Sequence, residues 1–115
     1  MPSDCIFCQI VAGTVSSEMV YQDDRVSAFR DIRPVAPVHI LIVPNKHIAS
    51  VNDVEEADEA VLGHLLLTAK RLAAQEGIAA TGYRLILNTG PHAGQVVFHL
   101  HLHLIGGQRM RYPMG

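Results

Sequence analysis

Residues Val96–Ile105, with the sequence VVFHLHLHLI, decide how the rest of this chain is interpreted. Histidines and leucines alternate here, which is the period of a β-strand and not of a helix. On a strand, His99, His101 and His103 share one face, and the intervening leucines share the other. Gly106 follows and ends the apolar run. The stretch therefore predicts a β-strand over residues 96–105 with a row of imidazoles along one side.

The composition predicts one soluble domain over residues 1–115. Apolar residues make up 49% of the chain and charged residues 17%, which is more apolar than a small monomer needs and indicates a buried subunit interface. The net charge is −2 and there is no basic stripe, so binding to nucleic-acid polymers is not expected. The apolar runs are too short to cross a bilayer, so no membrane role is expected.

The N-terminal region carries two cysteines, Cys5 and Cys8, on a predicted short helix that begins at Cys5 and stops at Gly13. Ser3 or Asp4 is the expected N-cap. The C-x-x-C pair has three interpretations: half of a zinc site, a redox pair, or two small buried side chains. The absence of a secretory pattern and the use of only two cysteines predict a location in the reducing cytoplasm.

Further strands and one long helix are predicted from hydrophobic spacing and turn residues. The strands are residues 20–21, 26–31, 39–43 and 83–88. The helix begins at an Asp53 N-cap, carries apolar residues at helical spacing as far as Ala73, and stops at Gly77. His64 lies within it and is interpreted as an ordinary surface or packing histidine. Because strands dominate, the predicted fold class is α+β with an antiparallel sheet.

Three alternating histidines allow three interpretations: an ordinary polar strand face, one metal site, or a catalytic row. Neighbouring side chains on one strand face lie ~6.6 Å apart and the outer two ~13 Å apart, so convergence of all three on one zinc ion is awkward. In a catalytic row the central histidine is a nucleophile. Imidazole attacks phosphorus and forms a phosphoramidate intermediate that water can cleave.

A catalytic row that acts on phosphorus also needs hydrogen-bond donors for the phosphoryl oxygens. The loop before the histidines offers the backbone N–H groups of Gly94–Val97 as an anion-binding concavity. The Asn88 side chain, at the end of the preceding strand, is a further donor. Together with the histidines, these groups predict a phosphate-binding reaction site.

The histidine stretch resembles the His-φ-His-φ-His-φ-φ signature (φ apolar) of the histidine triad superfamily, and its flanks, Gly94–Gln95 and Gly106–Gly107, fit the same pattern. Further matches lie at Cys5–Cys8, Tyr21–Asp24, Ala28–Ile32, Pro37–Ile40, Pro44–His47 and Gly63–His64. The resemblance spans roughly residues 5–113. It is to the histidine triad nucleotide-binding branch, the purine nucleoside phosphoramidases.

This resemblance implies a fold, an assembly and an activity. Members are homodimers whose antiparallel sheets, of about five strands each, join into one continuous sheet, with one long and one short helix in each chain. They hydrolyse nucleoside 5′-phosphoramidates and acyl-adenylates, release AMP or GMP, and require no cofactor. The implied partners are therefore a purine nucleotide substrate and a second copy of the chain.

The resemblance also implies roles for individual residues. His101 would attack the α-phosphate and form a nucleotidyl-histidine intermediate, and His103 would hold that phosphate. His99 and His39 would orient the nucleophile and relay protons toward the leaving group. Asp31 would accept the ribose hydroxyls, a sensible role for a carboxylate that faces two donors.

The other implied nucleotide contacts come from the loop before the histidines and from apolar side chains. Phosphate oxygens would be bound by Asn88 and by the backbone of Gly94, Gln95, Val96 and Val97. The purine would lie against Ile6, Phe7, Ile10, Phe29, Ile32 and Leu41. From the sequence alone, each of these apolar residues is also a candidate for the core.

Two positions depart from the common family pattern. Many members carry serine or threonine where this chain has Val96, and a valine can donate neither a proton nor a hydrogen bond to the leaving group. Protonation of the leaving group is then expected to rest on His99, His39 or water. Ala93 replaces a common glycine, which matters only if that position needs a positive φ.

The cysteines gain a further interpretation from the resemblance. Some zinc-containing members combine C-x-x-C with two later histidines, which correspond to His47 and His99 here. With Cys5 and Cys8, these would form a tetrahedral Cys₂His₂ site. His99 would then be unavailable as a proton relay, so its two implied roles compete.

Two alternatives to a phosphoramidase remain. One is a dinucleoside polyphosphate hydrolase of the same superfamily, which the Gly106–Gly107 flank and the short tail disfavour. The other is a non-catalytic module that binds a nucleotide for a protein partner.

Overall fold

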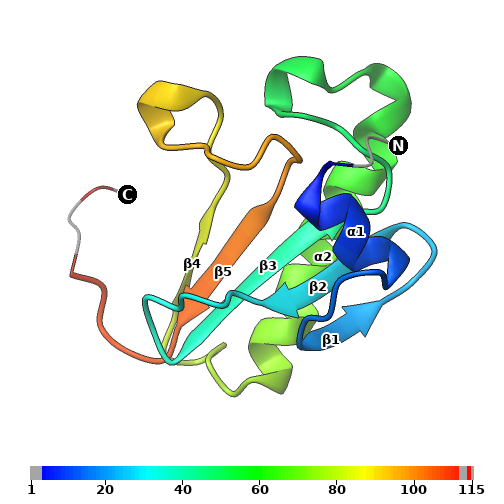
Figure 1. Ribbon diagram of the computed structural model, residues 1–115. Coiled ribbons are helices and arrows are strands. Elements are labelled where there is room, and N and C mark those ends of the chain that lie inside the picture. Colours follow the sequence, from blue (N-terminus) through cyan, green and yellow to red (C-terminus); the bar gives the residue numbers. More distant parts are fainter. Residues whose placement is uncertain (1–3, 112–113, 115) are drawn as a thin grey trace.

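The computed structural model describes residues 4–111 and residue 114 as a five-stranded antiparallel sheet with helices packed on it (Figure 1). The strands are β1 (Met19–Gln22), β2 (Val26–Arg30), β3 (Val38–Pro44), β4 (Tyr83–Ile86) and β5 (Leu102–Gly106). Their order across the sheet is β1-β2-β3-β5-β4. The expected α+β class with an antiparallel sheet is confirmed.

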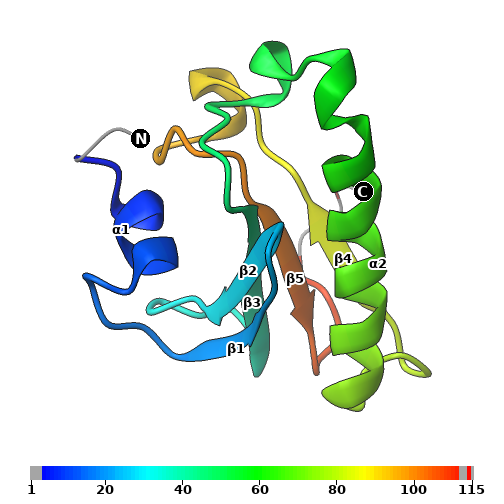
Figure 2. The same cartoon turned by 90° about the vertical axis from the view of Figure 1, so that its right-hand side faces the viewer.

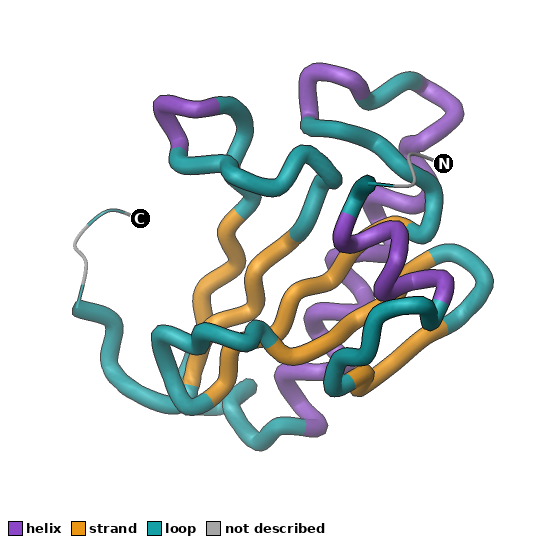
Figure 3. The backbone as a smooth tube through the Cα atoms, viewed as in Figure 1, coloured by secondary structure: helices purple, strands orange, loops and turns teal. Residues whose placement is uncertain are grey.

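The two α-helices, α1 (Ile6–Ala12) and α2 (Glu59–Gln75), lie on opposite faces of the sheet (Figure 2). Short 3₁₀ turns also lie in the connections, and the tube view draws them as helix (Figure 3). They are η1 (Val51–Asp53), η2 (Glu56–Asp58) and η3 (Pro91–Ala93). Among the described residues, no helix is long and apolar enough to cross a membrane.

Strand β3 is the centre of both cores, and all seven of its residues are buried. Successive side chains of a strand point to opposite faces. Ile40 and Ile42 accordingly join the apolar cluster beneath α2, whereas Leu41 and Val43 join a second cluster beneath α1. The buried central strand expected from the β-branched density of this segment is confirmed.

The histidine stretch forms a shorter strand than expected. β5 begins only at Leu102, so the prediction of a strand over residues 96–105 is wrong for residues 96–101. The β3–β5 ladder ends before β3 does: its last pair is Ile42 with Leu102, whereas β3 continues to Pro44 beside β2. Leu100 instead donates its backbone N–H to the carbonyl of Ile48 at 2.7 Å.

The starts of both helices also differ from the expectation. α2 begins at Glu59 and not after Asp53, because the intervening residues form 3₁₀ turns. The Asp58 carboxylate accepts the N–H of Glu55 at 3.0 Å and pairs with Lys46 at 2.7 Å. At α1 the N-cap is Cys5 and not Asp4, and Cys5 Sγ accepts the N–H of Cys8 at 3.3 Å. Ser3, the other expected cap, lies outside the described residues.

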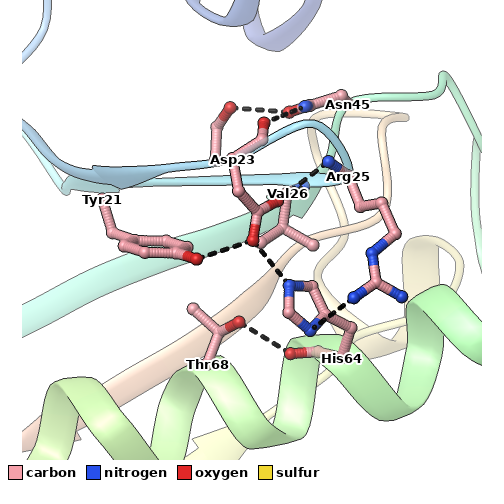
Figure 4. Close-up of polar contacts among 8 residues, drawn as sticks. Tyr21, Asp23, Arg25, Val26, Asn45, His64 and Thr68 are labelled. Atoms are coloured by element: carbon pink, nitrogen blue, oxygen red, sulfur yellow. Dashed lines mark hydrogen bonds and ion pairs between the residues drawn. The ribbon is translucent and has the colours of Figure 1, made fainter.

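His64 has a packing role, which is one of the roles expected for it. It is 9% exposed, and its Nε2 lies 2.6 Å from Asp23 Oδ2 in the turn between β1 and β2 (Figure 4). The same carboxylate oxygen accepts the Tyr21 hydroxyl at 2.7 Å. The other oxygen accepts the N–H groups of Arg25 and Val26, each at 2.8 Å. Asp23 therefore ties the β1–β2 turn to α2.

We predict a pH-dependent loss of stability on substitution of Asp23. Burial alone would raise the pKa of Asp23, but hydrogen bonds from His64, Tyr21 and the backbone outweigh it and hold the pKa well below its usual range. Asp23→Asn should lower the free energy of unfolding by about 1–3 kcal/mol at neutral pH. Because the folded pKa lies below the unfolded value of about 3.9, this stabilisation is full at neutral pH and is lost as the pH falls through the two pKa values.

Urea unfolding of the wild type and the variant at a series of pH values measures this effect. The difference between their unfolding free energies should shrink steadily below about pH 5. Asp24→Asn is the matched control, because Asp24 is the next residue and its side chain is exposed. An equal pH dependence for the wild type and Asp23→Asn would contradict the argument.

Candidate active site

The three histidines of the stretch lie on the α1 side of the sheet, although only His103 belongs to a strand. Leu100 belongs to the cluster beneath α2, as do the two leucines that follow it in β5, so the alternation of faces persists beyond the ladder. On the other side, the Phe7 ring of α1 meets His99 and His101 edge-on, with ring centroids 6.0 and 5.1 Å apart. The expected division into a histidine side and a leucine side is therefore present.

His101 has the geometry of a nucleophile. Its Nδ1 lies 2.8 Å from the backbone carbonyl of His99. A carbonyl oxygen can only accept a hydrogen bond, so this contact assigns the ring proton to Nδ1. The lone pair is then on Nε2, which is the atom available for attack. The side chain is 8% exposed, so its orientation is set by packing as well as by this bond.

His103 is held by a hydrogen bond from His39, whose ring lies beside Asp31. The backbone N–H of Val35 donates to His39 Nδ1 at 3.2 Å, which leaves the His39 proton on Nε2. This Nε2 lies 2.9 Å from His103 Nδ1 and 3.4 Å from Asp31 Oδ2. His103 Nδ1 therefore accepts, and its own proton is on Nε2. Arg33 N–H fixes the other oxygen of Asp31 at 2.8 Å.

Burial keeps this group of imidazoles neutral. It lowers the pKa of His39, against the opposing effect of Asp31. It also lowers the pKa of His103 to about 4, with further contributions from the positive charges that His101 and His39 can carry. At neutral pH, His103 is therefore a neutral ring that can donate one hydrogen bond from Nε2.

The His99 ring contacts the cysteines and not His101. Its Nε2 donates to the carbonyl of Pro44 at 2.8 Å, which leaves an unprotonated Nδ1 directed at Cys5 Sγ, 3.4 Å away. A proton relay through this ring, as expected from the sequence, has no supporting contact among the described residues. The group of His99 that touches His101 is its backbone carbonyl.

Cys5, Cys8, His47 and His99 form a cluster whose four candidate ligand atoms all lie within 4.8 Å of one another. The Nδ1 atoms of His47 and His99 are 3.2 Å apart, and Cys8 Sγ lies 3.4 Å from His47 Nδ1. Zinc bonds of about 2.0–2.1 Å to nitrogen and about 2.3 Å to sulfur place tetrahedral ligands about 3.3–3.8 Å apart. The donor set and its spacing therefore fit a zinc ion.

The redox interpretation of the cysteines fits less well. Burial and the neighbouring Cys5 raise the pKa of the Cys8 thiol to about 11, whereas redox-active cysteines have lowered pKa values. The third interpretation, two small buried side chains, describes Cys8 but not Cys5, which is only partly buried.

The loop before the histidines supplies fewer phosphate donors than expected. The N–H of Gly94 donates to Pro91 O at 3.0 Å and that of Gln95 donates to Gly90 O at 3.1 Å, so both are used within the turn. Within the described part of the chain, the N–H groups of Val96 and Val97 have no acceptor. The half-buried Asn88 amide likewise makes no hydrogen bond to the described residues. Ala93 lies in η3 and has no positive φ.

Most of the apolar residues expected around a purine are core residues. Phe7, Ile10, Phe29 and Leu41 form the buried cluster beneath α1, together with Val43. Ile6 is 40% exposed and Ile32 is 87% exposed, so these two present free apolar surface. Val97 packs against the same cluster, whereas Val96 is 85% exposed.

Sequence reasoning did not find several of the groups that hold this site together. The Pro44 carbonyl, the Val35 N–H and the Gln95 side chain all orient functional residues. Backbone groups leave no signal in a residue pattern, and a lone glutamine in a loop has no diagnostic spacing. The Pro44 carbonyl at the end of β3 and the Val35 N–H just before β3 reach the histidines only through the folded chain.

Comparisons with known proteins agree with this arrangement. The HIT domain family model matches residues 12–110. The chain is 53% identical over 115 residues to the purine nucleoside phosphoramidase of Escherichia coli K12. The alignment covers 100% of this chain and 93% of that protein. It is 49% identical to an uncharacterised HIT-like protein of Synechococcus elongatus, over 100% of both chains.

Solved structures of similar proteins share the whole fold. A HIT family hydrolase from Legionella pneumophila superposes with a TM-score of 0.94 at 48% identity, covering 97% of this chain and 100% of that chain. A histidine triad protein from Clostridium difficile superposes with a TM-score of 0.95 at 41% identity, covering 99% of each chain.

We predict that His103 stays neutral well below the pH at which an ordinary histidine becomes charged. Its ring should titrate with a midpoint of about 4 in ¹⁵N NMR spectra, because burial disfavours the charged form. Asp31→Asn should lower the midpoint further, since the carboxylate favours a charged ring. A midpoint near 6.5 would show that burial does not control this ring.

Proposed function

The chain belongs to the HIT domain family, and from this premise we propose that it hydrolyses purine nucleoside 5′-phosphoramidates and acyl-adenylates and releases AMP or GMP. The observation that carries the proposal is the oriented His101 ring, with Nδ1 bound to the His99 carbonyl and Nε2 free to attack. The similarity to the Escherichia coli purine nucleoside phosphoramidase, at 53% identity, supports the substrate class.

The proposed reaction has two displacements at the α-phosphorus. His101 Nε2 attacks phosphorus, the bond from phosphorus to the leaving nitrogen breaks, and the leaving amine takes up a proton. Water then attacks the nucleotidyl-histidine, the phosphorus–His101 bond breaks, and the nucleotide forms as the attacking water loses a proton to solvent. Each displacement develops charge on the phosphoryl oxygens, which His103 Nε2–H and the free N–H groups of Val96 and Val97 would stabilise.

The proton for the leaving group has a restricted set of sources. The His99 ring is turned toward the cysteines, and His39 Nε2–H donates to His103. Val96 has no proton to give and is 85% exposed, so water reaches the site beside it. We therefore infer that water protonates the leaving group in this chain.

The nucleoside would be held by the remaining groups. Asp31, held in place by Arg33 N–H and close to His39, would accept the ribose hydroxyls through its carboxylate. Ile32 and Ile6 would cover the purine with their exposed side chains. Asn88 would donate to a phosphate oxygen.

We also propose that the chain forms a homodimer, and two features of the chain support this proposal. Leu66 and Leu67 on α2 are 55% and 49% exposed, and such apolar surface is commonly covered by a partner. Among the strands that the structure describes, β4 lies at an edge of the sheet, and an edge strand can pair with a strand of another copy. We propose that two chains join through α2 and β4.

We predict that His101→Ala abolishes turnover of adenosine 5′-phosphoramidate, with a fall in kcat of more than about a thousandfold, because no other group replaces the nucleophile. AMP binding, measured by calorimetry, should persist in this variant. His92→Ala is the matched control and should keep full activity, because His92 is exposed and belongs neither to the histidine row nor to the Cys/His group. Mass spectrometry of wild-type protein quenched during turnover should detect an adenylyl group on His101.

Unchanged turnover in His101→Ala would exclude the mechanism. Faster turnover of a diadenosine polyphosphate than of the phosphoramidate would favour the rival hydrolase. Nucleotide binding without turnover of either substrate would favour a binding module.

We also propose that Cys5, Cys8, His47 and His99 hold a structural zinc ion, which the hydrolysis itself does not require. Such an ion would cross-link α1 to the end of β3 and to the segment before β5. The donor types support it, as do four of the separations between ligand atoms, which are 3.2–3.5 Å. The free thiols of the two cysteines suit the reducing cytoplasm, where we propose that the protein resides.

We predict about one zinc ion per chain in protein purified without chelators, measured by plasma mass spectrometry. Cys8→Ser should remove the metal and lower Tm, because the cross-link between α1 and the sheet is lost. His92→Ala should retain both the metal and Tm. A chain free of zinc, with a Tm that neither chelators nor added zinc change, would contradict the proposal.

A further inference from the structure

The Gln95 side chain is buried in a loop that is otherwise mostly exposed. The loop begins at Gly90, passes through η3 and reaches a left-handed turn at Gly94, which has φ of +84°. Gln95 follows and is only 4% exposed. A buried polar side chain loses free energy unless its hydrogen-bonding groups find partners.

Gln95 finds all of its partners in the backbone around the loop. Its Oε1 accepts the N–H of Gly90 at 2.9 Å. Its Nε2 donates to the carbonyl of Ala49 at 2.9 Å and to the carbonyl of Val97 at 3.1 Å. A primary amide has one acceptor oxygen and two N–H donors, and here every one of these groups is engaged.

These three bonds fix the loop at three separate points. The contact to Gly90 closes the turn, and the contact to Ala49 anchors it to the segment that follows β3. The contact to Val97 spans two residues and draws the backbone into an arc. Within the described residues, the N–H groups of Val96 and Val97 are the ones in residues 94–97 that make no hydrogen bond.

We propose that Gln95 is a positioning residue that holds the N–H groups of Val96 and Val97 where they bind the phosphoryl oxygens during hydrolysis. This inference rests on the proposed function. The side chain itself does not touch the nucleotide, because its amide is fully used by backbone groups. It acts by fixing two donors before the substrate arrives, and donors aligned in advance stabilise the charge that develops in each displacement.

The identity of the side chain follows from this geometry. A carboxylate at position 95 would keep the contact to Gly90, but would bring an oxygen against the carbonyls of Ala49 and Val97, which are acceptors themselves. A methionine would fill the same space and make none of the three bonds.

The test compares Gln95→Met and Gln95→Glu with wild type and with Gln22→Met as the matched control. Gln22 also donates two hydrogen bonds, to Val11 and Ser27, but lies on β1 at the far edge of the sheet. Both Gln95 variants should lose about 10- to 100-fold in kcat for adenosine 5′-phosphoramidate, with a smaller change in KM. Gln22→Met should keep kcat within about twofold of wild type.

A second measurement does not depend on turnover. In ¹⁵N NMR spectra of the wild type, AMP should shift the N–H signals of Val96 and Val97 strongly, and those of Gly94 and Gln95 less. In Gln95→Met the shifts at Val96 and Val97 should shrink. If the Gln95 variants fail to fold, the AMP-induced shifts in the wild type test the proposal. Equal shifts at all four N–H groups of residues 94–97 would overturn it.

The outcomes separate this inference from the function on which it rests. If the wild type binds AMP but hydrolyses no phosphoramidate, the proposed function is wrong. The NMR shifts would still test the placement of the Val96 and Val97 N–H groups. If wild type is active and the Gln95 variants lose Tm alone, with kcat and the AMP shifts unchanged, Gln95 is only structural and the proposal is wrong.

Discussion

The pairing of β3 with β5 is the constraint on which the rest of the structure depends. It sets His39 opposite Ile105 and Leu41 opposite His103. His39 and His103 are therefore diagonal neighbours on one face, close enough for their rings to bond at 2.9 Å. A slip of one residue would turn His103 into the core beneath α2 and bring a leucine to the reaction site, so the two apolar clusters enforce the catalytic register.

The end of this pairing is as important as the pairing itself. Beyond the Ile42–Leu102 pair the two strands separate, and carbonyl groups that a longer ladder would have used become free acceptors. The carbonyl of Pro44 takes the Nε2 proton of His99, and the carbonyl of His99 takes the Nδ1 proton of His101. The lone pair of His99 Nδ1 is therefore directed at the cysteines, and the lone pair of His101 Nε2 is left for the proposed substrate. His99 takes part in both sites because its ring contacts the cysteines and its backbone carbonyl contacts His101.

Alternation and turn chemistry are strong signals, and they predicted the sheet, the buried β3 and the separation of histidines from leucines. The same alternation overextended the strand, because the residues Val96–His101 have the strand period but no partner strand. The contact between Cys8 and His47, 39 positions apart, depends on how α1 lies on the sheet, so the resemblance and not the spacing suggested it. The bonds of Gln95 needed the folded loop, since they all reach backbone atoms.

Two adjacent valines divide the proposed site into a fixed part and a variable part. Val97 packs into the cluster beneath α1, and its carbonyl is held by Gln95, so its N–H cannot move without disturbing the core. Val96 is 85% exposed and contributes only its backbone to the site. In the proposed site, the buried Gln95 would hold the phosphate donors in place, whereas the exposed Val96 side chain would lie beside the leaving group and has no structural role in the core. Valine in place of a hydroxyl residue at this position would then alter the chemistry around the leaving group without altering the fold.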